Sequence, residues 1–432
     1  MDSTRSGSED TRPLLVSQGS LVSEDRYSSE NILLYKSGGS GQIATSVNLI
    51  KIGLGTGVLT LGFGAHVAGV VGCAAILALV ATLNVWSIYL LVQCEKTIAP
   101  RLNPHERNPR GKYSQIAYEA FGNYGVWLTD FFVVLTLMGA ATAYFVFVET
   151  TMVHVVPGYP AWFWVMVSYP VCILLVLPDD LRYLAPVSIV AIFSTVIGMC
   201  AVFAYGATQQ TFQIPEDAWF RPKGLPQCFG LCVYTFGHPV IIFPIYDQMK
   251  DRTTKFMPTV SVSLSMLVVC FAFVGLLSVG FFESVGVMQN SIAQLPSGSV
   301  ASKIVQTAMS IVILLSYPLT MFVVNKMVFQ YVSVWVGTAD PKLDYFVRIV
   351  LVSVAATGAL IFPHLADVVT ILGCFTITYL CFVNPMGFYY TLHKDTLSGI
   401  QKALLGFGGV LGLCTILYTT HSAVVAMLNR KV

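Results

Sequence analysis

Charged residues are scarce in this sequence. Asp, Glu, Lys and Arg together make up 11% of the 432 residues, whereas they make up about a quarter of soluble domains. Hydrophobic residues make up 55%, and apolar runs of about 20 residues, the length that crosses a bilayer, recur along the chain. Such runs are too long for the buried strands of a soluble α/β enzyme. The composition therefore predicts an all-α membrane protein with many transmembrane helices.

The motifs of common enzyme and metal sites are also missing. The seven histidines form no HExxH pattern and no close pair. The glycines from Gly55 onward fail as a dinucleotide fingerprint, because Thr60 occupies the third glycine position. The ten cysteines lie almost entirely in apolar runs, Cys228 and Cys232 four positions apart, and are expected to pack as small residues. We expect no enzyme activity, no cofactor, no metal site and no nucleic-acid partner.

The first 40 residues lack any apolar run and are rich in Ser, Gly and charge. They contain no signal-peptide core, and their composition predicts a disordered cytoplasmic tail over residues 1–40 before a transmembrane domain over residues 41–432. Asp10, Leu14 and Leu15 fit the acidic dileucine pattern (D/E)xxxL(L/I) that sorting adaptors read for lysosome-like or vacuole-like organelles. The pattern is short and also arises by chance. It nevertheless predicts a sorting adaptor as a partner of the tail.

Eleven candidate membrane spans follow the tail. They are predicted at residues 43–67, 70–94, 124–151, 160–178, 184–206, 225–247, 258–282, 301–334, 346–363, 366–391 and 403–427. Residues 112–122 are expected to form a short interfacial helix before the third span.

Lys and Arg are unevenly divided between the two sides of the membrane. Thirteen lie in the loops on the side of the N-terminal tail and three on the other side, where Arg430 and Lys431 add two more at the C-terminal end. Because cytoplasmic loops carry the excess of positive charge, the N-terminus is predicted to be cytoplasmic.

Two spans carry residues that interrupt a helix. Gly53, Gly55 and Gly57 alternate in the first span, and each costs a helix about 1 kcal/mol relative to alanine. Gly237 and Pro239 stand near the middle of the sixth span, where proline removes a backbone donor. Either break alone could be a simple kink. Broken helices in corresponding positions, five spans apart, indicate a binding site between two inverted repeats.

At these residues the chain resembles the amino acid/auxin permease family, and most closely its proton-assisted or vacuolar amino-acid transporter branch. LIKIGLGTGVLTLGFGAHVAG (Leu49–Gly69) is similar to that family's first helix, and YTFGHPVIIFPIYDQMKDR (Tyr234–Arg252) to its sixth. Leu177–Ser194 resembles the start of the fifth helix, and Leu314–Val328 resembles the eighth helix. The resemblance covers residues 42–427. It implies a leucine-transporter-type fold of ten helices in a 5+5 inverted repeat, plus one.

Two positions depart from the family pattern. Gly62 stands where the family usually has proline, and Asn48 stands where the proton-assisted branch has a histidine that is implicated in proton coupling. Asparagine does not titrate, so a proton step here needs another group or a different ion.

The resemblance implies that an amino acid binds at the two breaks. Free amides after the first break would hold its carboxylate, and carbonyls released in the sixth span would hold its amino group, with Tyr144 and Phe236 as possible lining residues. The implied substrate-binding residues are Gly53, Gly55, Thr56, Gly57, Val58, Tyr144, Tyr234, Thr235, Phe236 and Gly237.

Several polar residues are candidates for ion coupling. His238 lies at the sixth-span break and titrates in a useful range, although it could simply bond the loosened backbone. Ser316 and Thr320, one turn apart, could hold Na⁺, or their hydroxyls could bond back to their own helix. Asn48 is included because it occupies the coupling position. The carboxylates of the third span, Asp130 and Glu149, are weaker candidates.

Two charged residues are candidates for a cytoplasmic gate. Lys51 could pair with a carboxylate at the gate or extend to the membrane surface. Asp247 lies at the inner end of the sixth span, where it could take part in a gate or simply face water.

Taken together, these features predict a secondary active amino-acid transporter that works by alternating access. H⁺ is the expected coupling ion, while Na⁺ coupling, exchange and an amino-acid-sensing receptor on a transporter fold stay open. An integral position in membrane lipid, in a vacuolar or lysosomal membrane rather than the plasma membrane, is expected.

Overall fold

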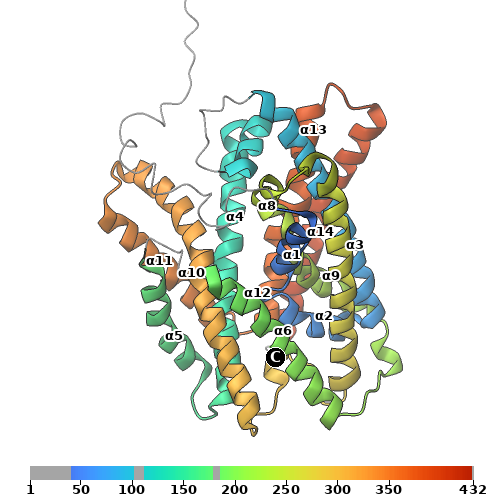
Figure 1. The fold of residues 1–432 in the computed structure, drawn as a ribbon, viewed down its shortest axis with the longest axis vertical. Coiled ribbons are helices and arrows are strands. Elements are labelled where there is room, and N and C mark those ends of the chain that lie inside the picture. The colour runs from blue at the N-terminus through green and yellow to red at the C-terminus, as the bar shows by residue number, and fades with distance from the viewer. Residues whose placement is uncertain (1–39, 102–110, 179–184, 431–432) are drawn as a thin grey trace, which may run out of the picture.

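The computed structural model describes residues 40–101, 111–178 and 185–430. The tail with its dileucine residues therefore lies outside the described residues, except for Ser40. The described part is helical apart from connections and one isolated bridge between Ser40 and Met249. Figure 1 shows the helices packed side by side along one long axis.

Every predicted span has a helical counterpart. In chain order these are α1 (Gln42–Gly53) with η3 (Val58–Thr60) and α2 (Leu61–Ala68), α3 (Val70–Ile98), α4 (Gly111–Val155), α5 (Ala161–Val176), α6 (Ala185–Gln209), α7 (Leu225–Thr235) with η8 (His238–Ile241) and α8 (Ile242–Gln248), α9 (Arg252–Phe282), α10 (Val300–Val336), α11 (Pro341–Ile361), α12 (Leu365–Ile371) continuing to α13 (Asn384–His393), and α14 (Gly399–Arg430).

The lengths of these helices confirm the all-α membrane architecture. Among the described residues, nine helices are long and apolar enough to cross a membrane, or ten if the bent pair α1 and α2 forms one span. Helix α5 is apolar but has only 16 residues. The break falls in the first span of each set of five, as the sequence predicted.

Local residues explain where several helices begin, bend and end. The Asp340 side chain accepts a hydrogen bond from the Lys342 amide at the start of α11. Helix α10 ends at Gly337, which has a positive φ of 76°. Gly122 has φ 64° and ψ −153° inside α4, so the predicted interfacial helix 112–122 runs into the third span through a kink.

The tenth span contains an irregularity that the sequence did not predict. Residues Leu372–Ile377 and Tyr379–Val383 are π-helical, between α12 and α13. The π stretch packs against α7, where a Cβ atom at Gly373 would lie 1.7 Å from the Gly230 carbonyl oxygen. The wider π turn and two glycines therefore bring the tenth and sixth spans into backbone contact.

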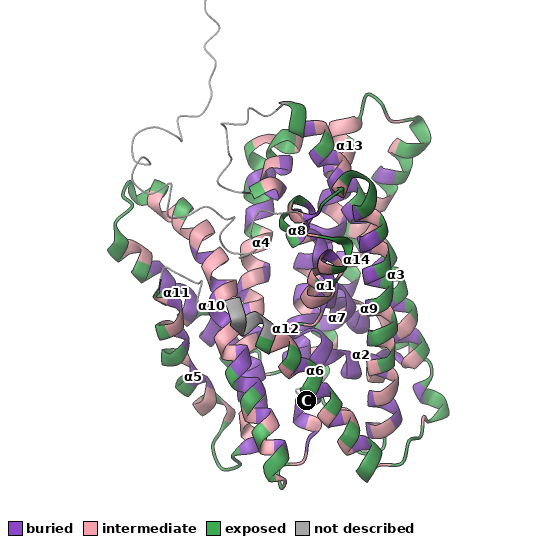
Figure 2. Cartoon of the chain, viewed as in Figure 1, coloured by how far each residue is buried: buried purple, intermediate pink, exposed green. Residues whose placement is uncertain are grey.

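Burial separates the enclosed spans from the peripheral ones. In the most apolar part of each span, 78% of the tenth and 67% of the sixth is buried, against 17% of α14. Figure 2 shows buried residues gathered around α1 and α7 in the middle of the bundle. The end of the bundle that holds the start of α4 and the end of α8 is called here the α1 end, and the end where α2 and α9 finish is called the α2 end (Figure 1).

Candidate functional site

The two helix breaks contact each other directly. The Thr56 hydroxyl lies 2.9 Å from the Tyr234 hydroxyl, within hydrogen-bond distance. A Cβ atom at Gly57 would lie 2.5 Å from Thr235 Oγ1 and 3.0 Å from Thr235 Cα. Only glycine lets the two backbones approach this closely. The structure thus brings together two segments that are about 180 residues apart in the sequence.

The first break leaves backbone donors unused. Helix α1 bends by 49° into the segment that begins at Val58. Among the described residues, the amides of Gly55, Thr56 and Gly57 donate no hydrogen bond to a backbone carbonyl. Gly55 is exposed, whereas Thr56 and Gly57 are buried. Unused donors at the start of a helical segment are suited to an anion such as a carboxylate.

Gly53 and Val58 flank these donors and pack rather than line open space. A Cβ atom at Gly53 would lie 2.9 Å from the Leu267 side chain of α9, so this glycine allows α1 to approach α9. Val58 is buried, and its amide donates to the Gly55 carbonyl at 3.3 Å.

The second break reorganises carbonyl groups. The Gly237 amide donates to the Tyr234 carbonyl at 3.3 Å, and the His238 amide donates to the Phe236 carbonyl at 2.7 Å. No such bond to the Thr235 carbonyl is present in the described residues. Among the carbonyls of Tyr234, Thr235 and Phe236 at this break, the Thr235 carbonyl is therefore the one with both lone pairs available for an amino group. The Phe236 side chain is fully buried against Phe271, with ring centroids 5.6 Å apart.

His238 connects the second break to the first span. Its side chain is fully buried, and Nε2 lies 3.0 Å from the carbonyl oxygen of Leu49, four residues before the last residue of α1. Nδ1 is buried and has no hydrogen-bond partner among the described residues. Asn48, the neighbour of Leu49, is half-buried. The ring thus bonds a backbone carbonyl of the first span, which was one of the two roles considered for His238. Its other nitrogen is left without a partner in the described residues.

The candidate residues of the third and eighth spans pair with each other. The Tyr144 hydroxyl lies 3.3 Å from the Thr320 hydroxyl, so these side chains join α4 to α10. The Ser316 hydroxyl donates to the Val312 carbonyl in its own helix at 2.9 Å. No hydrogen bond among the described residues joins these three side chains to the two breaks. Tyr144 and Thr320 thus form a pair between α4 and α10, while Ser316 bonds its own helix.

The two carboxylates of α4 differ in their partners. Asp130 accepts hydrogen bonds from the hydroxyls of Ser114, at 2.8 Å, and Tyr331, at 2.6 Å. Glu149 is also buried, but its Oε1 has no hydrogen-bond partner among the described residues. A buried carboxyl without a partner is costly when ionised, which makes Glu149 the more unusual of the two.

A charge network ties several helices together at the α1 end. Asp247 at the end of α8 lies 2.6 Å from Lys112 of α4 and 2.6 Å from Arg252 of α9. Lys112 also lies 2.9 Å from Glu95 of α3, which is buried. No ion pair joins Lys51 to a carboxylate among the described residues. Sequence reasoning identified Asp247 but missed Glu95 and Lys112, because their convergence depends on the packing of three helices.

The chain segment before α1 reinforces this closure. The Ser40 amide donates to the Gln248 carbonyl at 2.6 Å, and the Lys250 amide donates to the Ser40 carbonyl at 3.0 Å. These bonds attach the start of α1 to the connection that follows α8.

A family model that matches most of the chain identifies its family. Residues 38–425 match the family model described as transmembrane amino acid transporter protein. The chain belongs to this family. The two contacting breaks therefore lie in an amino acid transporter, and the sequence resemblance is confirmed. The family consists of transporters, in agreement with the expectation that the chain is not an enzyme.

Relatives of this transporter are known from plants, insects and yeast. It is 22% identical to "Amino acid transporter ANT1" of Arabidopsis thaliana, covering 89% of this chain and 92% of that protein. It is 23% identical to "Proton-coupled amino acid transporter-like protein pathetic" of Drosophila melanogaster, covering 86% and 81%. It is 25% identical to "Vacuolar amino acid transporter 3" of Schizosaccharomyces pombe, covering 71% of this chain and 46% of that protein.

A solved structure of MhsT in complex with L-phenylalanine is also similar to the transporter. The identity is 11%, the TM-score is 0.48, and the match covers 89% of this chain and 99% of MhsT.

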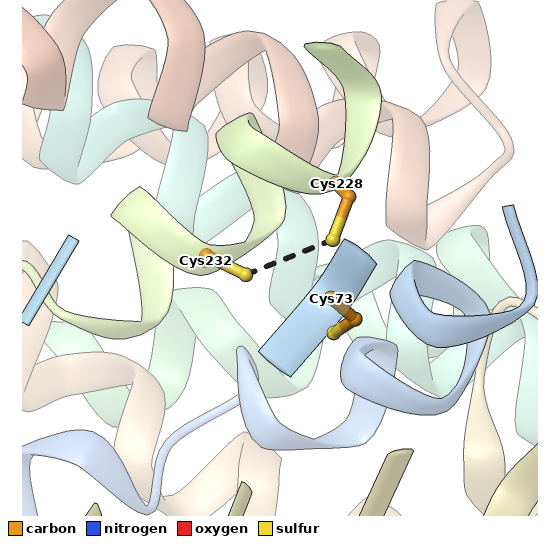
Figure 3. Close-up of side chains that lie close together, drawn as sticks. All are labelled: Cys73, Cys228 and Cys232. Atoms are coloured by element: carbon orange, nitrogen blue, oxygen red, sulfur yellow. Dashed lines mark hydrogen bonds between the residues drawn. The ribbon is translucent and has the colours of Figure 1, made fainter. Parts of the chain in front are cut away.

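Three cysteines of the transporter converge between α3 and α7 (Figure 3). The sulfur atoms of Cys73, Cys228 and Cys232 all lie within 4.8 Å of one another, and all three side chains are buried. Cys228 and Cys232 face the same way because they are one helical turn apart. Three sulfur donors are a set that suits a soft metal cation. The expectation that these cysteines only pack stays a prediction.

Proposed function

We propose that this chain is a secondary active transporter that moves an amino acid and a proton across an organellar membrane by alternating access. The observation that carries the proposal is the direct contact between the two breaks, which places unused amides and an available carbonyl on adjoining segments. If each break only bent its own helix, the two breaks would not be expected to lie in contact with each other.

The polar groups suit the two ends of an amino acid. The amides of Gly55, Thr56 and Gly57 would bind the carboxylate at the start of the helical segment that leads into α2. The Thr235 carbonyl lies at the C-terminal end of α7, which is the negative end of the helix dipole. It would accept a hydrogen bond from the ammonium group. The Thr56–Tyr234 hydrogen bond joins the two breaks that carry these groups.

Alternating access requires an end that opens. The network of Asp247, Lys112 and Glu95, together with the Ser40 backbone bonds, closes the α1 end in this conformation. Opening this end would separate α8 from α4 and break the Asp247–Lys112 pair. Asp247 thus acts as a gate residue in the proposal, whereas Lys51 is left without a defined partner at the gate.

A proton is the coupling ion that we favour. His238 joins the two broken spans and keeps one buried nitrogen unused, so a proton taken up there would alter the contact between them. The name of the Drosophila relative supports proton coupling in this family. Na⁺ held by Ser316 and Thr320 is the second candidate, because these hydroxyls lie one turn apart on α10.

We place the α1 end in the cytoplasm and the α2 end in the lumen of a vacuole or lysosome. The excess of Lys and Arg in the loops of the α1 side supports the orientation. The name of the yeast relative and the dileucine pattern at Asp10, Leu14 and Leu15 support the organelle. An adaptor that reads this pattern would be a partner of the tail.

Uptake by purified protein in liposomes tests the proposal. Each of the twenty amino acids is offered in labelled form, with a pH gradient and a Na⁺ gradient imposed separately. We expect a subset to enter under the pH gradient without Na⁺. Uptake that needs Na⁺ would replace the proton with Na⁺, and saturable binding without any flux would identify a receptor instead of a transporter.

A further inference from the structure

A second polar cluster lies at the α2 end, away from the breaks. His66 near the end of α2 has its Nδ1 2.8 Å from Glu283 Oε2, and Arg221 Nη1 lies 2.8 Å from Glu283 Oε1. The Glu283 side chain is 8% exposed, whereas that of His66 is 33% exposed. A buried carboxylate is thus shared by one permanent cation and one histidine that reaches the surface.

The cluster is attached to the backbone of the first span. The Arg221 side chain donates to the His66 carbonyl at 2.6 Å, and the Arg221 amide donates to the Ala68 carbonyl at 2.8 Å. The Val71 amide donates to the Trp219 carbonyl at 3.0 Å. The loop before α7 therefore holds the end of α2, and Glu283 adds a contact from the end of α9.

Charged groups of both signs surround His66, and the Arg221 Nη1 atom lies 3.5 Å from its Nδ1. Glu283 faces it from α9, and Arg221 faces it from the loop, where Asp217 pairs with Arg221 at 2.6 Å. Lys223 in the same loop is exposed. Of the other helices packed against α2, α7 has no charged residue and α3 has its charges near the α1 end.

With a neutral histidine, Glu283, Asp217 and Arg221 carry a net charge of −1. Protonation of His66 brings the group to zero, which removes the excess negative charge around a buried carboxylate. It also turns a hydrogen bond in which only the Glu283 carboxylate is ionised into one in which both partners are ionised.

We propose that His66, with Glu283 and Arg221, is a proton-binding site on the lumenal side that controls the outer half of the first broken span. Helix α2 has eight residues and is about 12 Å long, so its two ends move as one piece. One end adjoins the amides at the break and the other carries His66. A proton on His66 fixes α2 to α9, and its release loosens that attachment.

This inference rests on the proposed transport function but concerns a different place from His238. His238 is fully buried between the breaks, whereas His66 is accessible from the α2 end. Protons from an acidic lumen therefore reach His66 without any opening of the transporter.

Exchange of a labelled amino acid at equal pH on both sides of the liposome membrane tests the site, because no gradient or protein orientation then affects the result. The probe is the amino acid that enters fastest in the panel above. The occupancy of any site that binds a single proton changes by at most about a hundredfold between pH 5.5 and pH 7.5. We expect wild-type exchange to change by up to that factor.

The variants separate a proton site from a structural contact. His66→Gln keeps a hydrogen-bonding side chain but cannot take up a proton, so its exchange should change less between these two pH values than wild-type exchange does. Glu283→Gln keeps the histidine but removes the carboxylate. The change in exchange with pH should therefore occur at a lower pH than in the wild type. His154→Gln is the matched control, because His154 lies one residue before the end of α4, on the same side, and its ring bonds the Thr150 carbonyl of its own helix, at 2.8 Å, with no other hydrogen-bond partner in the described part of the chain.

Each result decides the inference. A pH profile of His66→Gln equal to that of the wild type, or a profile flattened equally by His154→Gln, overturns the site. The pH dependence of amino-acid binding to the purified variants is measured in parallel. Binding shows whether His66 titrates even if exchange is absent, whereas absent flux alone refutes only the proposed function.

Discussion

Gly57→Ala tests whether the two breaks depend on their close approach. The Gly57 backbone has φ −60° and ψ −41°, a conformation that alanine adopts without strain. The added methyl would nevertheless lie 2.5 Å from Thr235 Oγ1 and 3.0 Å from Thr235 Cα. A rotation of the hydroxyl relieves the first contact, but the backbone of α7 must move to relieve the second.

The expected cost follows from these contacts. Overpacking in a close-packed interior costs about 1–3 kcal/mol. Alanine recovers about 0.4–1 kcal/mol because it restricts the unfolded chain. The net loss of stability should therefore lie between zero and about 2.6 kcal/mol, with a value of about 1.3 kcal/mol at the middle of both ranges. It should appear as a lower unfolding temperature in detergent and as weaker uptake, because the Thr56–Tyr234 pair is pushed apart.

Two further variants make the test specific. Gly55→Ala is the matched control for stability, because a Cβ atom there meets only its own backbone, the Ile52 carbonyl oxygen, at 3.8 Å. Thr235→Ala removes the nearest atom, so the double variant Gly57→Ala with Thr235→Ala should lose less stability than the sum of the single variants. Equal unfolding temperatures for Gly57→Ala and Gly55→Ala, or strict additivity in the double variant, would refute the contact.

Three other predictions address different parts of the fold. Thr56→Val and Tyr234→Phe should each lose about 1 kcal/mol, and the double variant little more, because they remove the same hydrogen bond; additive losses in thermal unfolding would contradict this. Asp247→Asn should weaken closure at the α1 end and increase the reactivity of membrane-impermeant probes applied from that end; unchanged accessibility would exclude a gate. Gly373→Ala should prevent normal packing of the tenth span, since a Cβ atom would lie 1.7 Å from the Gly230 carbonyl oxygen; wild-type expression and unfolding temperature would contradict that contact.

The helix breaks were predictable because their causes are local. Alternating glycines at 53, 55 and 57 and the proline at 239 weaken a helix wherever it lies, so their effect can be read from the sequence. Span lengths follow from the same kind of local information, since apolar runs must match the bilayer thickness. These features predicted the all-helical architecture and both broken spans.

The partners across the fold were not predictable in the same way. Lys112 pairs with both Glu95 and Asp247, which are 17 and 135 positions away. Such a network depends on how three helices pack, and no spacing in the sequence encodes it. The π-helical stretches of the tenth span have no composition signal either. The signal that was available for His66 was its place two residues before the end of α2, the second half of a broken span.

The steady-state ratio of labelled amino acid inside and outside sealed liposomes tests the central claim most directly. With one amino acid carried per proton, a gradient of one pH unit can support a concentration ratio of about ten. We predict that the wild-type protein accumulates its substrate toward that ratio without Na⁺, and that a protonophore returns the ratio to one. A ratio that stays at one while the protein binds the same amino acid, or that responds only to Na⁺, would contradict the account.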